Sequence, residues 1–285
     1  MPLFHSVAPR PAALPRRPLT IGELLDAAVQ VIRGPAWVLL PLALVFAIAE
    51  QGILLPVRDA LGVDFLDGFQ DDFGTTVAAL WSITALGLGL EAFIITALGP
   101  WAGRAVAADL IGQPLPAGRL IRPRAKEIAT VLVAAPTAAL FSTVGALLLI
   151  FWVPGYALFG LAGAAAGMER RGPLSAIARS ARLAFRGGMR ATRVRILGAI
   201  SWLILRLGFF SGVSALLSML PLNDIAGFWV LTAGFVIGNA AAYAFLAALD
   251  AATLAECRFR SEGLDIWLSR AERHGQLTPD ALATR

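Results

Sequence analysis

Long apolar runs with almost no charge, separated by arginine-rich segments, limit what this chain can fold into more than any other feature of its sequence. All but two of its 24 lysine and arginine residues lie in four segments between or beside these runs. Because backbone groups inside a bilayer must be hydrogen-bonded internally, apolar runs of this kind are expected to cross as helices. The basic segments are 1–35, 104–127, 169–195 and 257–285, and the expected membrane spans are 36–56, 77–101, 128–151, 153–168, 196–220 and 226–255.

The charge pattern also predicts an orientation. Cytoplasmic loops of membrane proteins are enriched in lysine and arginine, so we expect both termini to be cytoplasmic. The fourth run is the shortest, but it must cross as well, because otherwise the arginines of 169–195 would face the opposite side. The preference for arginine over lysine, with much alanine and glycine, indicates a GC-rich bacterial source and hence a bacterial plasma membrane.

Composition agrees with a membrane protein, since only 15% of residues are charged and 58% are hydrophobic, whereas soluble domains have about 25% charged residues. We therefore predict an all-α, polytopic membrane helix bundle with six transmembrane helices in one domain, residues 19–268. Residues 1–18 are rich in proline and arginine and predict a disordered cytoplasmic tail. Residues 269–285 are expected to form a second cytoplasmic tail.

A short amphipathic helix is expected before the first span. Thr20 and Glu23 have the spacing of a capping box, which starts a helix, and Gly34–Pro35 would end it. Apolar and charged residues recur at helical spacing between these signals. Such a helix is expected to lie in the membrane interface.

Polar residues inside the spans are the candidates for function. A central arginine costs about 2.5–3.5 kcal/mol on insertion scales unless it is paired, so we expect Arg206 to pair with Glu91 at similar depth, with Glu50 as second choice. Asn239 is expected to hydrogen-bond to another helix, and Asp250 to lie near the cytoplasmic headgroups. The buried pair either fixes the register of the helices or forms part of a proton or substrate pathway.

The cytoplasmic segment 169–195 is the expected interaction surface. Its arginines recur at helical spacing, on a helix that Gly187–Gly188 is expected to interrupt. An arginine face beside a membrane binds anionic lipid phosphate with about 1 kcal/mol per residue. This face either anchors the topology alone or docks a specific lipid or a cytoplasmic or membrane protein partner. The candidate contact residues are Arg179, Arg182, Arg186, Arg190 and Arg193.

Signatures of catalysis are missing from the sequence. The two histidines, His5 and His274, lie in opposite tails, and Cys257 is the only cysteine. No hydrolase, metalloprotease or nucleotide-binding motif is present, so we expect no catalytic residue, no cofactor and no metal. The basic residues flank membrane spans, so anionic lipid rather than nucleic acid is the expected partner.

Glycine pairs at 163/167, 208/212 and 234/238 predict close helix packing within the chain, with a homo-oligomer as the alternative.

Three separated stretches resemble one known family. They are RPLTIGELLD at 17–26, ERRGPLSAIARSARL at 169–183 and ECRFRSEGLD at 256–265. In this order they resemble a family of six-span actinobacterial membrane proteins similar to the membrane domain of glycerophosphoryl diester phosphodiesterase. That family usually has aspartate where this chain has Glu256, and an aromatic pair where this chain has Leu254 and Ala255. The resemblance implies a six-span fold but not phosphodiesterase activity, because catalysis in that enzyme belongs to a separate soluble barrel.

Two functions follow from these features. The first is a non-catalytic scaffold or accessory membrane component whose arginine face contacts anionic lipid or a partner protein. The second is a transporter or permease for a small molecule or lipid, with Glu91 and Arg206 in its pathway. A dry, packed pair of these residues would favour the first function, and a polar vestibule around them would favour the second.

Overall fold

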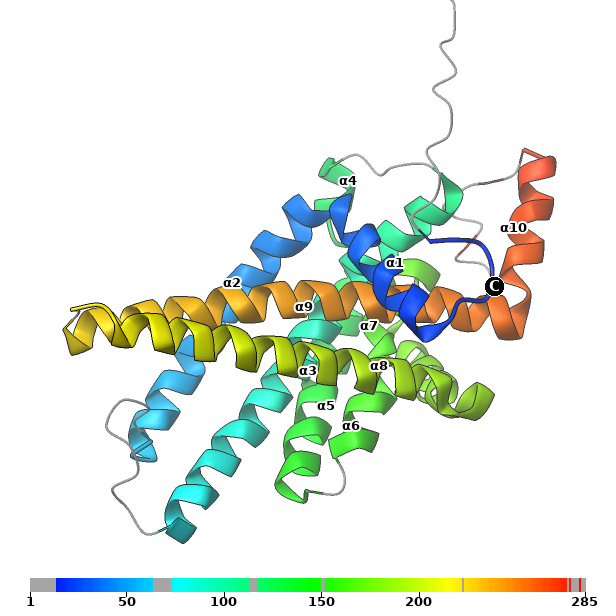
Figure 1. Cartoon of the computed structure of the whole chain (residues 1–285). Helices are drawn as coiled ribbons and strands as arrows, with labels where there is room; N and C mark the ends of the chain where they lie inside the picture. Colours follow the sequence, from blue (N-terminus) through cyan, green and yellow to red (C-terminus); the bar gives the residue numbers. More distant parts are fainter. Residues whose placement is uncertain are drawn as a thin grey trace, which may run out of the picture.

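The computed structural model describes residues 14–63, 73–112, 117–149, 152–221 and 223–275, together with residues 277 and 282. These residues form helices and no strand (Figure 1). The all-helical class expected from the sequence is therefore confirmed for this part of the chain.

Five helices among the described residues are long and apolar enough to cross a membrane, as a membrane-embedded protein requires. Three of them extend well beyond the expected spans, since α3, α8 and α9 have 39, 46 and 39 residues. The five helices are α2 (Ala36–Ala60), α3 (Phe73–Ile111), α5 (Ala125–Leu147), α8 (Pro173–Ser218) and α9 (Asp224–Glu262).

The expected fourth span consists of two short helices, α6 (Trp152–Phe159) and α7 (Leu161–Glu169). Neither is long enough to cross alone, so the described residues contain five candidate spans rather than six. The two helices meet at Gly160, where a Cβ atom would lie 1.7 Å from a guanidinium nitrogen of Arg195. The break thus lies where a charged side chain from α8 passes close to the backbone.

A kink divides α8 at the glycine pair where an interruption is expected from the sequence. Arg186 has extended backbone angles, and Gly187, Gly188 and Met189 have φ values of 60°, 68° and 59°. Glycine adopts positive φ without a steric penalty. The pair therefore lets the chain change direction between the two parts of α8.

The N-terminal helix α1 (Ile21–Arg33) begins at the expected capping box of Thr20 and Glu23. Its apolar face is buried and packs mainly on α9. The segment before it is also packed, because Leu14 is fully buried and its N–H donates to Asp109 Oδ2 at 2.9 Å. Residues 14–18 thus differ from the expected disordered tail, and residues 1–13 of that tail lie outside the described residues.

The C-terminal part likewise continues the fold beyond residue 268. Helix α10 (Leu264–Arg273) buries Leu268 and Ala271. Leu282 is also buried, and its carbonyl accepts a hydrogen bond from Arg258 Nη1 at 3.3 Å. Most of the expected C-terminal tail beyond Gly275 lies outside the described residues.

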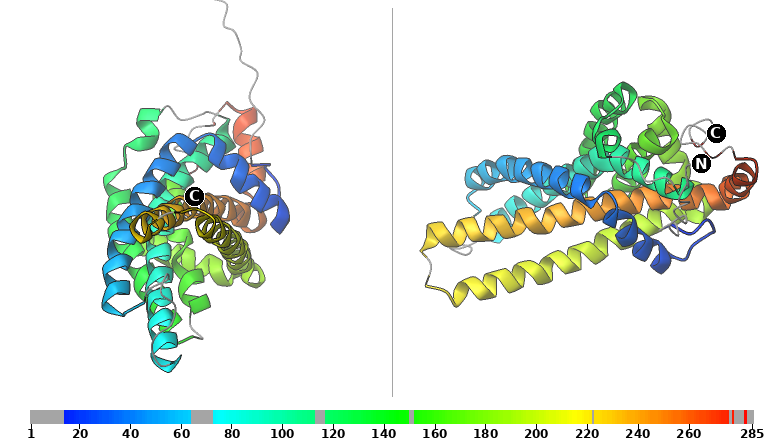
Figure 2. Two further views of the ribbon diagram at one scale, coloured as in Figure 1. Left: turned by 60° about the vertical axis from the view of Figure 1, so that its left-hand side comes forward. Right: turned by 90° about the horizontal axis from the view of Figure 1, so that it is seen from above.

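The helices converge at one end of the molecule and diverge toward the other (Figure 1). We call the end with α1, α10 and the short helix α4 (Ala117–Ile121) the closed end. The end with the turn between α8 and α9 is called the open end. From the closed end, α8 and α9 extend as a long hairpin alongside α2 (Figure 2).

Glycines set the closest approach between α3 and α7. A Cβ atom at Gly163 would lie 2.1 Å from the carbonyl oxygen of Thr96, and one at Gly167 would lie 2.1 Å from that of Pro100. The expected close packing at this glycine pair is confirmed. At Gly208 and Gly212 a Cβ atom would meet nothing within 4 Å, so this pair makes no such contact within the described part of the chain.

Candidate functional site

A hydrogen-bonded network of five side chains, which we call the polar network, joins α2, α3, α8 and α9. Arg206 Nη2 pairs with Glu91 Oε2 at 2.8 Å, and Arg206 Nη1 donates to Asn239 Oδ1 at 3.3 Å. Asn239 Nδ2 donates to Glu50 Oε2 at 3.0 Å, and Tyr243 OH donates to Glu50 Oε1 at 2.6 Å. Four separate helices thus place their intramembrane polar groups at one point.

The structure brings together four of the residues singled out in the sequence. The Arg206–Glu91 pair forms as predicted, and Glu50 is linked to it through Asn239 rather than directly. Sequence reasoning missed Tyr243. Helical spacing could have identified it, since Tyr243 follows Asn239 by four residues and therefore lies on the same face of α9.

Charge within the polar network is unbalanced. Glu50 and Glu91 are both buried, with 3% and 5% of their surface exposed. The guanidinium of Arg206 pairs with Glu91, whereas Glu50 forms no ion pair with any described residue and accepts from neutral donors. The network therefore holds two carboxyl groups for one guanidinium.

A cavity of about 860 Å³ opens beside the polar network, between α2, α3, α8 and α9. Its volume is in the range of about 300–1,000 Å³ that is typical of small-molecule sites. All five network residues line it, together with apolar side chains and three serines of α8. The serines are Ser211, Ser214 and Ser218.

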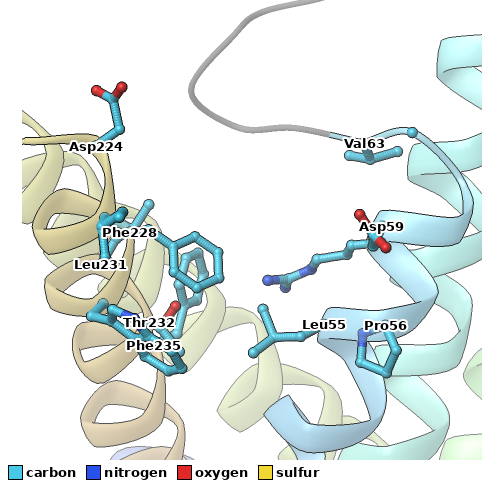
Figure 3. Close-up of a pocket in the computed structure, with 13 residues that line it drawn as sticks. Leu55, Pro56, Asp59, Val63, Asp224, Phe228, Leu231, Thr232 and Phe235 are labelled. Atoms are coloured by element: carbon cyan, nitrogen blue, oxygen red, sulfur yellow. The ribbon is translucent and has the colours of Figure 1, made fainter.

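A second cavity, of about 790 Å³, lies between the open-end parts of α2 and α9. Figure 3 shows Asp59 on α2 and Asp224 on α9 at opposite sides of it. The two cavities have four lining residues in common and therefore adjoin, and the first cavity itself extends from the polar network to Asn223 and Asp224 at the open end. The shared residues are Arg58, Asp224, Leu231 and Phe235.

Asp250 is buried inside the helix bundle, and its place near the cytoplasmic headgroups stays a prediction. It is 3% exposed and pairs with Arg195 Nε at 2.6 Å. The same guanidinium donates to the carbonyl of Tyr156 and lies 4.3 Å from the centroid of its ring. Sequence reasoning placed Arg195 in the cytoplasmic segment, whereas α8 buries it on the closed-end side of the bundle, where it neutralises Asp250.

The predicted arginine face of 169–195 divides into inward and outward residues. Arg179 is 5% exposed and pairs with Glu169 at 2.8 Å and Glu262 at 2.5 Å. Arg190 is partly buried and pairs with Glu256 at 2.9 Å. Both are corrections to the predicted contact surface, since the rotation of α8 turns these side chains toward α7 and α9.

Three arginines of this segment are exposed, as predicted: Arg182, Arg186 and Arg193. They lie on both sides of the α8 kink at the closed end. They therefore form a smaller basic surface than the sequence suggested.

Within the described ranges, no group of three or more histidine, cysteine, aspartate or glutamate side chains could hold a metal ion. Comparisons with protein-family models, with curated proteins and with solved structures found no match for this chain. The site as the structure shows it is a cluster of hydrogen-bonded polar side chains that lines a largely apolar cavity.

Proposed function

We propose that this protein is a membrane permease that admits a small molecule or lipid into the cavity between α2, α3, α8 and α9. One observation supports this proposal over a purely structural role for the Arg206–Glu91 pair. The pair lines a cavity of about 860 Å³ that is continuous with the open end, instead of lying in a dry, packed core. Intramembrane ionisable residues that line cavities are typical of substrate and ion pathways.

The proposal includes a topology. We place the protein in a bacterial plasma membrane with both termini in the cytoplasm, so that the cavity opens outward. In this arrangement α6 and α7 together form a short sixth crossing, and α1 lies in the cytoplasmic interface. The excess of arginine at the closed end supports this orientation. The sequence resemblance to six-span actinobacterial membrane proteins agrees with the number of crossings.

Thiol labelling tests whether the cavity is open to water. Cys257 is the only cysteine, so a Cys257→Ala background gives a thiol-free protein. Ser211 lines the cavity, whereas its neighbour Gly212 does not, and a side chain added at Gly212 meets nothing within 4 Å. A membrane-impermeant maleimide applied to intact cells should label Ser211→Cys and not Gly212→Cys, because thiols react as thiolates and need water.

Two other labelling results would each contradict the proposal. Labelling of neither variant would show that no aqueous path reaches the cavity from outside, and would refute the proposal. Equal labelling of both would show that this depth of α8 lies in open water, which also contradicts a cavity within the membrane.

A scaffold or accessory role is the second candidate function. The observation that favours it is the exposure of Arg182, Arg186 and Arg193 at the closed end. Exposed arginines beside a membrane are suited to binding anionic lipid or an acidic partner protein. This role is compatible with a permease, because the two surfaces lie at different ends of the molecule.

A further inference from the structure

We propose that the cavity takes a molecule with one positively charged group and an apolar body, and that Glu50 binds the charged group. This inference rests on the proposed function and names the class of its substrate. An amphiphilic ammonium or phosphonium ion has the required chemistry.

The first support is the position of Glu50. Its carboxyl group is 3% exposed and lines the cavity, and it receives hydrogen bonds from Tyr243 and Asn239, which are both neutral. The guanidinium of Arg206 is already paired with Glu91. Burying an ionised carboxylate is costly unless it is paired. Arg206 and Arg58 interact with Glu50 electrostatically, but Glu50 has no ion-pair partner among the described residues. A cation in the cavity would supply that direct partner.

The second support is the charge along the whole path. Carboxyl groups outnumber guanidinium groups among the described residues that line the two cavities. Clefts lined by an excess of one charge concentrate ligands of the opposite charge. The acidic residues are Glu50, Asp59, Glu91 and Asp224, and the basic residues are Arg58 and Arg206.

The third support is the aromatic lining. A cation within about 6 Å of an aromatic ring centroid is attracted by the ring face, and the guanidinium of Arg58 already lies 5.5 Å from the ring of Phe235. The aromatic rings line the path from its entrance to the polar network. They belong to Phe210, Phe228, Trp229, Phe235 and Tyr243.

Unsatisfied polar atoms add a fourth, independent observation. Gln51 lines the cavity and is 3% exposed, and its Oε1 has no hydrogen-bond donor among the described residues. An acceptor that lines the same cavity as Glu50 complements a cation with an N–H group. The Nε–H of Arg206 also lacks an acceptor in the same part of the chain, so the ligand body can include a neutral acceptor such as an ester oxygen.

Two ions of the same shape and opposite charge provide the test. The purified protein, in nanodiscs of neutral phosphatidylcholine, is titrated with tetraphenylphosphonium and separately with tetraphenylborate, and empty nanodiscs correct for partition into lipid. Wild type should bind tetraphenylphosphonium saturably and tetraphenylborate only in proportion to the lipid. Glu50→Gln should weaken tetraphenylphosphonium binding about tenfold or more, because it removes one partner of a buried charge pair.

Glu50→Gln is suited to the test because it keeps the size of the side chain, and its amide oxygen can still accept the hydrogen bond of Tyr243. Its NH2 group replaces the oxygen that accepts from Asn239, so its thermal unfolding is measured to show that it folds. Glu272→Gln, which removes a carboxylate on α10 outside both cavities, should bind as wild type does. Saturable binding of tetraphenylborate, or equal affinity of wild type and Glu50→Gln for tetraphenylphosphonium, would overturn the inference. Absence of saturable binding for both ions would overturn it too, and the labelling of Ser211→Cys then shows separately whether the proposed function stands.

Discussion

At the scale of single residues, the Arg206–Glu91 pair is the clearest case of a charge that needs its partner. Removing one member of a buried ion pair costs about 3–5 kcal/mol, whereas replacing both by apolar residues is often neutral. We therefore expect Glu91→Leu to lower the free energy of unfolding by about this amount, and the double variant Glu91→Leu, Arg206→Leu to lose less. Unfolding in mixed micelles, followed by circular dichroism, measures both. A double variant less stable than the single one would show that Arg206 has other, larger contacts.

Gly163 offers a second residue-scale prediction, because the backbone of α3 passes directly against it. A Cβ atom there would lie 2.1 Å from the carbonyl oxygen of Thr96, so α3 and α7 must separate in Gly163→Ala. We expect the free energy of unfolding to fall by about 1–3 kcal/mol, as in other overpacked cores. The matched control is Gly208→Ala, where the added atom meets nothing within 4 Å and the change in a helix interior should stabilise by up to about 1 kcal/mol. Similar losses in both variants would argue against the close α3–α7 contact.

At the scale of helices, the start of α1 makes a pH-dependent prediction. The Arg17 guanidinium, followed by the backbone N–H and hydroxyl of Thr20, lowers the pKa of Glu23 from 4.5 to about 2. Because the pKa is depressed in the folded state, the stabilisation by Glu23 is fully present above pH 4.5 and is lost as the pH falls through about 2. Arg17→Gln should raise the pKa of Glu23 toward 4.5, as followed by the carboxyl carbon resonance of labelled glutamate.

The control for this titration is Arg33→Gln, which removes a charge at the opposite end of α1. Its Glu23 resonance should titrate as in wild type. If Arg17→Gln leaves the midpoint near 2, the ion pair with Arg17 does not determine the charge state of the capping box.

The helices could be predicted from the sequence because the signals for them are local. Apolar runs, the capping box at Thr20 and the glycine pair at 187–188 each act over a few residues. The Arg206–Glu91 pair was also predictable, since an unpaired charge at that depth is costly and Glu91 lies at similar depth.

Other contacts could not be predicted, because they depend on how distant helices rotate about their axes. The pairing of Arg195 with Asp250, and the inward position of Arg179, follow from the packing of α8 against α7 and α9. Helical spacing places arginines on one face but does not say which element that face meets. For the same reason the sequence is compatible with a cavity beside the polar network but equally compatible with a packed core there.

At the scale of the whole molecule, the two ends have opposite constructions. At the closed end, ion pairs connect α7, α8 and α9. Arginines there also bind the segment before α1, since Arg190 and Arg260 both donate a hydrogen bond to the carbonyl of Leu19. The open end holds the two adjoining cavities, and there the guanidinium of Arg58 on α2 lies over the ring of Phe235 on α9. This asymmetry is the arrangement expected of a site that admits a molecule from one side.

The exposed arginines at the closed end lead to a prediction for the molecule as a whole. If that end faces anionic lipid headgroups, replacing Arg182, Arg186 and Arg193 together by glutamine removes up to about 3 kcal/mol of attraction, at about 1 kcal/mol per residue. Native mass spectrometry of protein extracted from mixed anionic and neutral lipid should show less co-purified anionic lipid for the triple variant. The difference between wild type and the triple variant should shrink in high salt, because salt screens exposed charges.

Arg179 and Arg190 are unsuitable for this comparison. They pair with Glu169, Glu262 and Glu256 inside the bundle, and their removal would destabilise the fold. Undiminished anionic lipid in the triple variant would mean that the orientation of the chain, and not lipid binding, accounts for these three charges.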